Sequence, residues 1–510
     1  MPLQQPHATY RGYRTAGIRL SEELDASAVV PGISDPASFL AAAHRFDKAH
    51  VVMLTERELI PRSAGAAILN ELRRLEKHDI VEQRARVGGE RHSGEQYLIR
   101  ALGEDVGGHI NLARSSGDLG AVSRRIVHRD HLLDLVGELN ALRGALHEQA
   151  TAHVETVMPG YTHGQVAQAT TFGHWLAMWA NVFARDCERA LALYRRLNLS
   201  PAGAGMLTGS DIPVDRERTA HLLGFDGPIP HTMDAILSHD TDCLETAAVL
   251  GIATANLGRL GDDLQLWFSS EFGFVDVPDR FCGTSSIMPQ KRNPDFPEAT
   301  KSIAVLAVSG LTSAFLAEKG PTGLSFRERR VTDDTLDRVF TLAIAQLAAT
   351  TTVLRDVTVD ANRTLAAATG GWAQATDLAA AVSRHSALPW RSAHQIVGIL
   401  VRLCGERGLL PQDVTPQLVD EAAVAYLGRP VELPEMILRD ALDPRQGVER
   451  RTLLGGPSPH ALRAALASLQ HSLDRDRAEV TAVRNRLEGA AADLEQAIDD
   501  ILTRPSPDGP

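Results

Sequence analysis

Apolar residues recur along much of the chain at the spacing of an α-helix. From His128 onward, leucine and valine positions follow one another at steps of mostly three or four residues, which places them on one helical face. This pattern ends at Pro159 and Gly160, residues that break a helix. Further long helical patterns cover residues 172–197, 241–268, 296–317 and 334–359. Long helical segments with few strand-like stretches between them predict an elongated all-α bundle.

The texture of the sequence changes near residues 35 and 370. Residues 1–35 contain Pro and Gly without a clear period, which indicates an irregular arm. After Gly371 the helical segments become shorter, and the chain closes with a charged helix and a polar tail from Thr503. We therefore predict three units: an N-terminal helical domain with an arm (residues 1–115), a central bundle of long helices (residues 116–369), and a small C-terminal helical domain with a tail (residues 370–510).

Composition supports a helical, globular protein. The chain has 510 residues, of which 44% are apolar and only 5% aromatic, a balance that favours helix over sheet. The net charge of −12 and the lack of a basic stripe argue against nucleic acid as a partner. The N-terminal residues have no apolar signal core, and the most apolar uncharged run, residues 302–317, is shorter than the roughly 20 residues of a membrane span, so we expect no membrane partner.

The cysteines have no metal-site spacing. There are four, none in a CxxC pair: Cys187, Cys243, Cys282 and Cys404. Scattered cysteines in a long chain indicate reduced thiols and a cytoplasmic protein. We expect neither a metal nor a cofactor.

Three polar segments interrupt the helical pattern, at breaks where functional loops are usually held. The first is "ARSSGDLG", residues 113–120. The guanidinium of Arg114 suits a carboxylate, and Ser115 and Ser116 add hydroxyl donors. The alternative interpretation is a helix N-cap, formed by a serine or by Asp118.

The second polar segment is "PGYTHGQVAQAT", residues 159–170. Thr162, His163 and Gln165 lie just after a predicted helix end. The near-neutral pKa of an ordinary histidine suits His163 to proton transfer. The alternative is a histidine that is simply solvated or hydrogen-bonded in a loop.

The third polar segment is "GTSSIMPQKRNPD", residues 283–295. Lys291 and Asn293 could hold a carboxylate or an oxyanion, and Gly283 with the serine pair would let backbone amides approach the same anion. A serine could act as a base if its proton were lost into a site rich in positive dipoles. The alternative, a Ser-capped surface turn ended by proline, explains the prolines but not the crowding of donors.

This third segment resembles the signature loop of the fumarase/aspartase superfamily, GSSxMPxKxNP. The resemblance is closest to the argininosuccinate lyase branch, through "MPGYTHGQVAQATTFGHWL", "LNLSPAGAGMLTGSDIPVDRE" and "SSEFGFVDVPDRF", and it covers roughly residues 35 to 410. It implies a three-domain, all-helical subunit, a homotetramer with a 20-helix core, and active sites that each take their three segments from three subunits. It also implies reversible anti β-elimination from a succinyl compound, giving fumarate.

The resemblance assigns roles to individual residues. Ser285 would be the base that takes the Cβ proton, with Lys291 and Asn293 holding the carboxylate beside the developing carbanion and Ser286 adding a donor. His163 would deliver a proton to the leaving nitrogen or bind the second carboxylate, and Glu298 would pair with it. The remaining substrate-binding candidates are Arg114, Ser115, Ser116, Thr162 and Gln165.

This sequence departs from the branch in three segments. We interpret the departures as changes to the pocket for the amine part of the substrate. Where argininosuccinate lyases usually read GRSRND, Ser116 and Gly117 replace the second Arg and the Asn. The Ser-(Glu/Asp)-Arg-Asp stretch has become "DAILSHDTD", with His239 near the Arg position. The segment like YxRDxQEDK has become "SFRERRVTDD", which has no Tyr, Gln or Lys and contains Arg327, Arg329 and Arg330. Three arginines suggest a leaving group with carboxylates of its own, of which Arg327 and Arg330 are the predicted binding residues. Surface or interhelical ion pairs are the alternative.

The leading hypothesis is a carbon–nitrogen lyase that cleaves an N-substituted aspartate, an aminopolycarboxylic acid such as ethylenediamine-N,N'-disuccinate, into fumarate and an amine. One alternative is an argininosuccinate lyase with a diverged pocket. Another is a non-catalytic structural homologue, as the lens crystallins of this family are.

Overall fold

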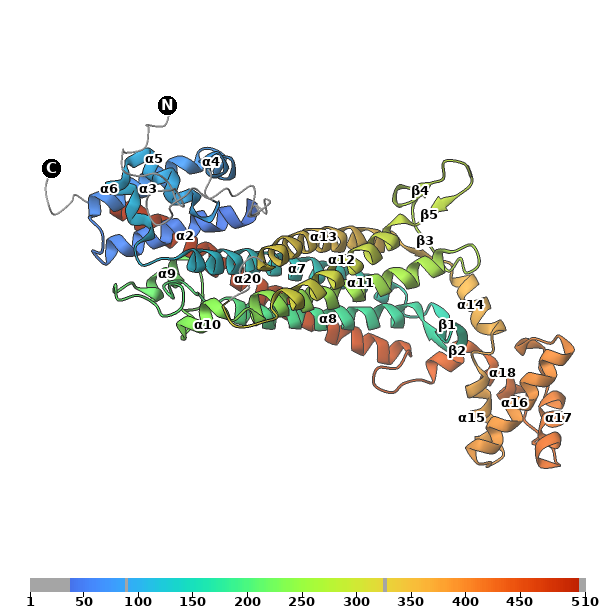
Figure 1. Cartoon of the computed structure of the whole chain (residues 1–510). Helices are drawn as coiled ribbons and strands as arrows, with labels where there is room; N and C mark the ends of the chain where they lie inside the picture. The colour runs from blue at the N-terminus through green and yellow to red at the C-terminus, as the bar shows by residue number, and fades with distance from the viewer. Residues whose placement is uncertain (1–36, 88–89, 324–327, 504–510) are drawn as a thin grey trace.

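The computed structural model describes residues 37–87, 90–323 and 328–503 of the chain (Figure 1). The predicted N-terminal arm, residues 1–35, therefore lies outside the described residues. The N-terminal domain is a cluster of short helices, with single 3₁₀ turns at Glu90–His92 and Gly108–Asn111. Its α-helices are α2 (Ala37–Glu56), α3 (Arg62–Glu76), α4 (Ile80–Val87), α5 (Ser93–Leu102) and α6 (Glu104–Gly107).

Long helices lie side by side in the middle of the molecule, as the leucine pattern predicts (Figure 1). They are α7 (Ser116–Ala152), α8 (Phe172–Leu197), α11 (Thr246–Phe268), α12 (Asp295–Ala317) and α13 (Glu328–Asp356). Helix α7 packs against α8 and α13, and α11 packs against α12. The predicted apolar face of α7 is fully buried at Leu135, Leu139 and Leu142. The all-helical fold class is confirmed.

Short elements connect the long helices. Helices α9 (Arg216–Leu222) and α10 (Thr232–Leu237) follow α8, and a π-helical turn at Asp240–Glu245 leads into α11. Two pairs of very short strands then form: β3 (Val275–Asp276) with β6 (Thr358–Val359), and β4 (Gly283–Thr284) with β5 (Arg292–Asn293). A 3₁₀ turn at Asp279–Phe281 separates β3 from β4. The β4–β5 hairpin projects from the bundle at the end opposite the N-terminal domain (Figure 1).

A β-hairpin follows α7 where the sequence pattern indicates only a helix end. Strands β1 (Val157–Thr162) and β2 (Gln165–Thr171) pair antiparallel. The register shifts between Pro159 and Tyr161, which is where proline and glycine interrupt the alternation. The hairpin places Thr162, His163 and Gln165 of the second polar segment at its tip.

The small C-terminal domain has its own core, which includes Leu378, Ile396 and Leu438. Its helices are α14 (Ala361–Gly370), α15 (Ala375–His385), α16 (Trp390–Arg407), α17 (Pro416–Leu427), α18 (Glu435–Leu442) and α19 (Pro444–Glu449), with a 3₁₀ turn at Pro411–Asp413. The change of texture near Gly371 matches the short gap between α14 and α15.

Helix α20 (Pro459–Thr503) leaves this domain and runs back along the bundle to the N-terminal domain (Figure 1). It packs against α7 and α8 and then against α2 and α3. Ion pairs fix its position: Arg143 Nη1 lies 2.6 Å from Asp476 Oδ2 in a buried pair, and the buried Lys48 contacts the partly exposed Glu495. The grouping of residues 370–510 into one C-terminal unit therefore does not describe how α20 packs.

Helix α12 carries an apolar face that the chain leaves uncovered. Among the described residues it is the one helix long and apolar enough to cross a membrane by length and composition alone. The exposed apolar side chains include Val305 (69% exposed), Val308 (48%), Phe315 (59%) and Leu316 (57%).

Candidate active site

The first polar segment begins helix α7. The Ser115 hydroxyl accepts hydrogen bonds from the backbone N–H of Gly117 (3.0 Å) and Asp118 (3.3 Å), and the Asp118 carboxylate accepts one from the Ser115 N–H (3.4 Å). This is a capping box. It explains why α7 begins well before the leucine pattern does. Ser115 is thus the predicted helix cap, and Ser116 is the half-buried residue that follows it.

Arg114 is held inside the N-terminal domain. Its Nη1 lies 2.8 Å from Asp47 Oδ1, its Nη2 donates to the Asn111 side-chain oxygen at 2.8 Å, and its side chain is 2% exposed. Burial raises the pKa of Asp47, but the adjacent guanidinium groups of Arg114 and Arg84 outweigh it and hold that pKa below its usual value. Arg114 therefore supports the turn before α7, and its carboxylate partner within the chain is Asp47.

Gly117 lies against a glycine-containing loop that the sequence analysis assigned no role. A Cβ atom at residue 117 would lie 2.7 Å from Sδ of Met206, and the Ser115 hydroxyl donates to the Gly205 carbonyl at 2.9 Å. A larger residue at position 117 would require Met206 to move. The departure at Gly117 and the position of Met206 are therefore coupled. The segment "PAGAGMLTGSD" was the signal for this loop, because Gly203, Gly205 and Gly209 all have positive φ.

The stability of the fold depends on pH through Asp118, a buried residue in the first turn of α7. Burial raises the pKa of Asp118 to about 7. Because the folded-state pKa lies above the unfolded value, this group stabilises the fold below about pH 4, and the stabilisation is lost as pH rises to about 7. We expect Asp118→Asn, whose amide oxygen can still accept from Ser115, to gain stability over the native chain as pH rises, on the order of 4 kcal/mol at full ionisation.

The measurement is the thermal unfolding midpoint of both proteins between pH 4 and pH 8. A suitable control is Asp360→Asn, which alters an exposed capping carboxylate at the start of α14. Parallel curves for Asp118→Asn and the native chain would contradict the expected difference.

The second polar segment covers most of the β1–β2 hairpin, and its residues Thr162, His163 and Gln165 lie at the tip. Thr162 pairs with Gln165, and the two residues between them have positive φ: 55° for His163 and 70° for Gly164. A two-residue loop with both central residues in this region matches the twist of a hairpin. Residues 162–165 are all exposed, so the His163 side chain lies on the surface of the single chain.

Helix α7 keeps the first two segments apart. Ser116 is its first residue, and His163 lies beyond its last. A helix of 37 residues is about 55 Å long. Ser116 and His163 of one chain therefore lie at opposite ends of the bundle and cannot meet around one small substrate.

The third polar segment is the β4–β5 hairpin and the loop between its strands. The Ser285 hydroxyl accepts from the backbone N–H of Met288 (3.0 Å) and, more weakly, of Ile287 (3.3 Å). Ser285 is half-buried, whereas Ser286 and Lys291 are exposed and Asn293 is half-buried. The segment thus combines a hydroxyl held by two amides with a cation and a side-chain amide.

Gly283 allows the helix that follows to pack against the hairpin. A Cβ atom at this position would lie 2.1 Å from Asp295 Oδ2. A larger residue at position 283 would therefore require the side chain of Asp295, the first residue of α12, to move.

Glu298, predicted to pair with His163, lies in the first turn of α12 and is exposed. Its carboxylate accepts from the side-chain amide of Gln265 at 3.2 Å. The structure does not bring Glu298 and His163 of one chain together into a pair.

Of the three arginines in "SFRERRVTDD", the structure describes two, and these two have different surroundings. Arg327 lies outside the described residues. Arg329 forms a buried ion pair with Glu318 at 3.1 Å, which ties the end of α12 to the start of α13 and matches the alternative of an interhelical pair. Arg330 lies half-buried in the first turn of α13.

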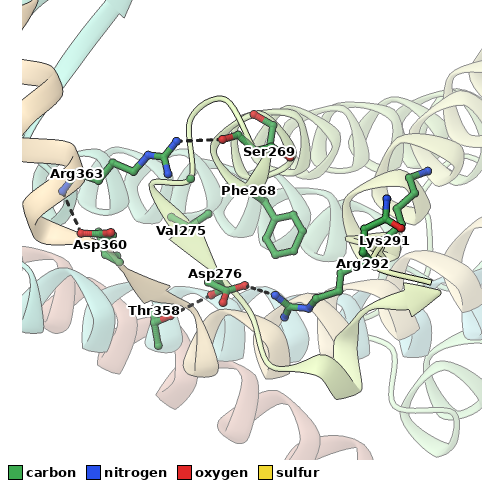
Figure 2. Close-up of a pocket in the computed structure, with 13 residues that line it drawn as sticks. Phe268, Ser269, Val275, Asp276, Lys291, Arg292, Thr358, Asp360 and Arg363 are labelled. Carbon is green, nitrogen blue, oxygen red and sulfur yellow. Dashed lines mark hydrogen bonds and ion pairs between the residues drawn. The ribbon is translucent and has the colours of Figure 1, made fainter. Parts of the chain in front are cut away.

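A cavity of about 700 Å³ lies at the base of the signature loop (Figure 2). Its lining includes Phe268, Asp276, Lys291, Arg292 and Arg363. Among the residues that the structure describes, no three His, Cys, Asp or Glu side chains gather as a metal site would require.

Matches to family models and to known relatives identify the protein as a carbon–nitrogen lyase of the fumarase/aspartase superfamily. A model of the lyase family matches residues 41–309, and a model of the argininosuccinate lyase C-terminal region matches residues 372–449. The chain belongs to the argininosuccinate lyase branch of this superfamily.

Curated relatives and solved structures support this assignment. The argininosuccinate lyase of Methanococcoides burtonii is 34% identical over 89% of this chain and 90% of its own length, and that of Methanothrix thermoacetophila is 35% identical over 90% and 92%. A crystal structure of EDDS lyase in complex with formate is similar with a TM-score of 0.86, 29% identity and 94% coverage of both chains. The class II fumarase of Schistosoma mansoni, with 15% identity, 81% and 91% coverage and a TM-score of 0.68, shares the fold.

Proposed function

We propose that the protein catalyses reversible anti β-elimination of an N-substituted aspartate to fumarate and an amine. We propose further that its substrate class is an aminopolycarboxylic acid such as ethylenediamine-N,N'-disuccinate. The observation that carries the reaction is the Ser285 hydroxyl, which is held by two backbone amides in the loop that also contains Lys291 and Asn293.

Proton removal from carbon is assigned to Ser285. When its hydroxyl loses a proton, the N–H groups of Ile287 and Met288 already point at the oxygen and stabilise the alkoxide. The alkoxide takes the Cβ proton, and charge passes to the adjacent carboxylate as an aci-carboxylate. Lys291 and Asn293 hold that carboxylate and bind it more strongly as the charge develops, which is the condition for catalysis.

Departure of the nitrogen is assigned to His163. Its exposed position at a strained two-residue turn suits it to reach a substrate held by another chain. A neighbouring subunit's Glu298 would orient the imidazole and stabilise its cation. Thr162 and Gln165 flank it as donors to the second carboxylate.

Assembly into a homotetramer is part of the proposal. Helix α7, about 55 Å long, lies between Ser116 and His163, so the first and second segments of one site would come from different subunits. The uncovered apolar face of α12, which includes Val305 and Phe315, gives copies of the chain a surface on which to associate. The four cysteines are free thiols, in keeping with a cytoplasmic enzyme.

The residues expected near the amine part of the substrate support a leaving group other than arginine. Gly117 replaces the Asn of the branch, and Met206 occupies the adjacent space. Arg330 is half-buried at the start of α13, close in sequence to the lost Tyr, Gln and Lys positions, and offers a cation to a carboxylate on the amine. Argininosuccinate lyase activity is the second candidate, favoured by the identity of 34% to the Methanococcoides burtonii enzyme.

Fumarate release separates these candidates. We expect the purified protein to release fumarate, followed by ultraviolet absorbance, from ethylenediamine-N,N'-disuccinate faster than from argininosuccinate, because the guanidine-side residues of the branch are missing. Aspartate and N-alkyl aspartates serve as matched substrates of smaller size. Release from argininosuccinate alone would assign the second function, and no release from any of them would favour a non-catalytic homologue.

A further inference from the structure

Arg292 stands between two of the proposed carboxylate-binding residues. It belongs to strand β5, with Lys291 before it and Asn293 after it. Lys291 lies just before the strand, and the side chains of Arg292 and Asn293, as consecutive strand residues, point to opposite sides. Figure 2 shows Arg292 reaching Asp276, whereas the Lys291 side chain extends away from that contact.

The guanidinium of Arg292 donates to acceptors in one short segment. Its Nη1 lies 3.1 Å from Asp276 Oδ1, its Nη2 donates to the Val277 carbonyl at 2.6 Å, and its Nε lies 2.8 Å from Asp279 Oδ1. It also stands over the ring of Phe268, 5.7 Å from the centroid, at the end of α11. One side chain thus joins strand β5 to the segment before the signature loop and to a long helix.

The segment that receives Arg292 is anchored in the bundle. Strand β3 pairs with β6, with Val275 opposite Val359 and Asp276 opposite Thr358. Val275 and Val277 are buried in the main hydrophobic core. The carboxylate of Asp276 therefore extends from a backbone that the core holds in place.

We propose that Arg292 is a positioning residue, which clamps the β4–β5 hairpin to this anchored segment and thereby fixes Lys291, Asn293 and Ser285 for catalysis. The proposal rests on the proposed function of the signature loop. Arg292 touches no substrate in it and acts through its neighbours. Only two residue pairs join the strands, Gly283 with Asn293 and Thr284 with Arg292, so the hairpin's own pairing fixes its direction weakly.

An arginine suits position 292 because its guanidinium group is planar and forked. Its donors diverge in one plane and can meet three acceptors on different residues at once, whereas a lysine ammonium is a compact charge on a flexible stem. We therefore expect Arg292→Lys to retain part of the clamp and Arg292→Met to lose it.

The test compares Arg292→Met and Arg292→Lys with Arg280→Met. Arg280 is a matched control: it pairs with Asp356 at 2.5 Å and stands 4.6 Å from the Phe281 ring, but it lies outside the hairpin. For Arg292→Met we expect kcat for fumarate release to fall about 100-fold, KM to change much less, and the thermal midpoint and oligomeric size to stay at native values. Arg292→Lys should recover part of kcat, and Arg280→Met should match the native enzyme.

A second readout does not depend on turnover. Hydrogen–deuterium exchange of the peptide covering residues 283–293 should be faster in Arg292→Met than in the native protein and unchanged in Arg280→Met. Native kcat in Arg292→Met, or unchanged exchange, overturns the clamp. If the native protein releases no fumarate from any substrate but the exchange rates differ as expected, the proposed function fails while the clamp stands.

Discussion

Replacement of Ser285 by alanine is expected to lower kcat for fumarate release by about a thousandfold or more, because the variant has no group to take the Cβ proton. The fold should be unaffected. Ser285 is half-buried in a surface loop, and the hydroxyl makes its hydrogen bonds to amides of the same loop. Turnover with a saturating substrate, together with circular dichroism and the thermal midpoint, measures both effects.

Ser286 supplies the matched control for this result. It is the next residue, is exposed, and is proposed as a donor and not as the base. We expect Ser286→Ala to lose only about tenfold in kcat, the size of one hydrogen bond to a charged group. Near-native turnover in Ser285→Ala would remove Ser285 as the base, and equal losses in both variants would mean that the loop acts without a dedicated base.

Two inactive variants are expected to restore activity to each other when their subunits are mixed. Ser285→Ala and His163→Asn damage segments that the proposed tetramer draws from different subunits. In hybrid tetramers some sites then receive both native segments. Random mixing in equal amounts should give about a quarter of the native sites. Asparagine suits position 163, because it tolerates the φ of 55° found there and cannot transfer the proton.

The experiment requires subunit exchange by mild unfolding and refolding of the mixture, followed by the fumarate assay. Each variant refolded alone is the control for recovery by refolding itself. Mass spectrometry of intact oligomers shows that hybrids have formed. Hybrid tetramers without activity would contradict a shared site, as would a fully active monomer of the native protein.

The long helices were predictable because burial of one face requires the leucine spacing, and that spacing is local. The start of α7 was open to two interpretations, because the residues that form its capping box, Ser115 and Asp118, are also polar enough to suggest a binding segment. The β1–β2 hairpin was missed because Pro159 and Gly160 obscure the alternation of β1. A proline and a glycine that end a helix are also compatible with an irregular strand.

The sequence could predict that Ser285, Lys291 and Asn293 share one loop, because they lie in one short stretch of the chain. Arg114 shows the limit. Its partner, Asp47, comes from a distant helix, so the sequence does not reveal that its charge is already matched. Arg329 is a similar case, since Glu318 receives it. Spacing identifies which groups are available, but only the fold determines which of them are already paired.

The N-terminal domain is finished by the segment of the described chain that is synthesised last. Leu494, Ala497, Ile498 and Ile501 of α20 belong to the same hydrophobic cluster as Phe46 and Leu69. During translation, part of the hydrophobic core of the N-terminal helices therefore stays exposed until α20 has been synthesised. Closure of that core depends on contacts between the two extremes of the described sequence, which are slow to form. Chaperone binding to the nascent chain should accordingly be strongest on the N-terminal helices and end when α20 docks.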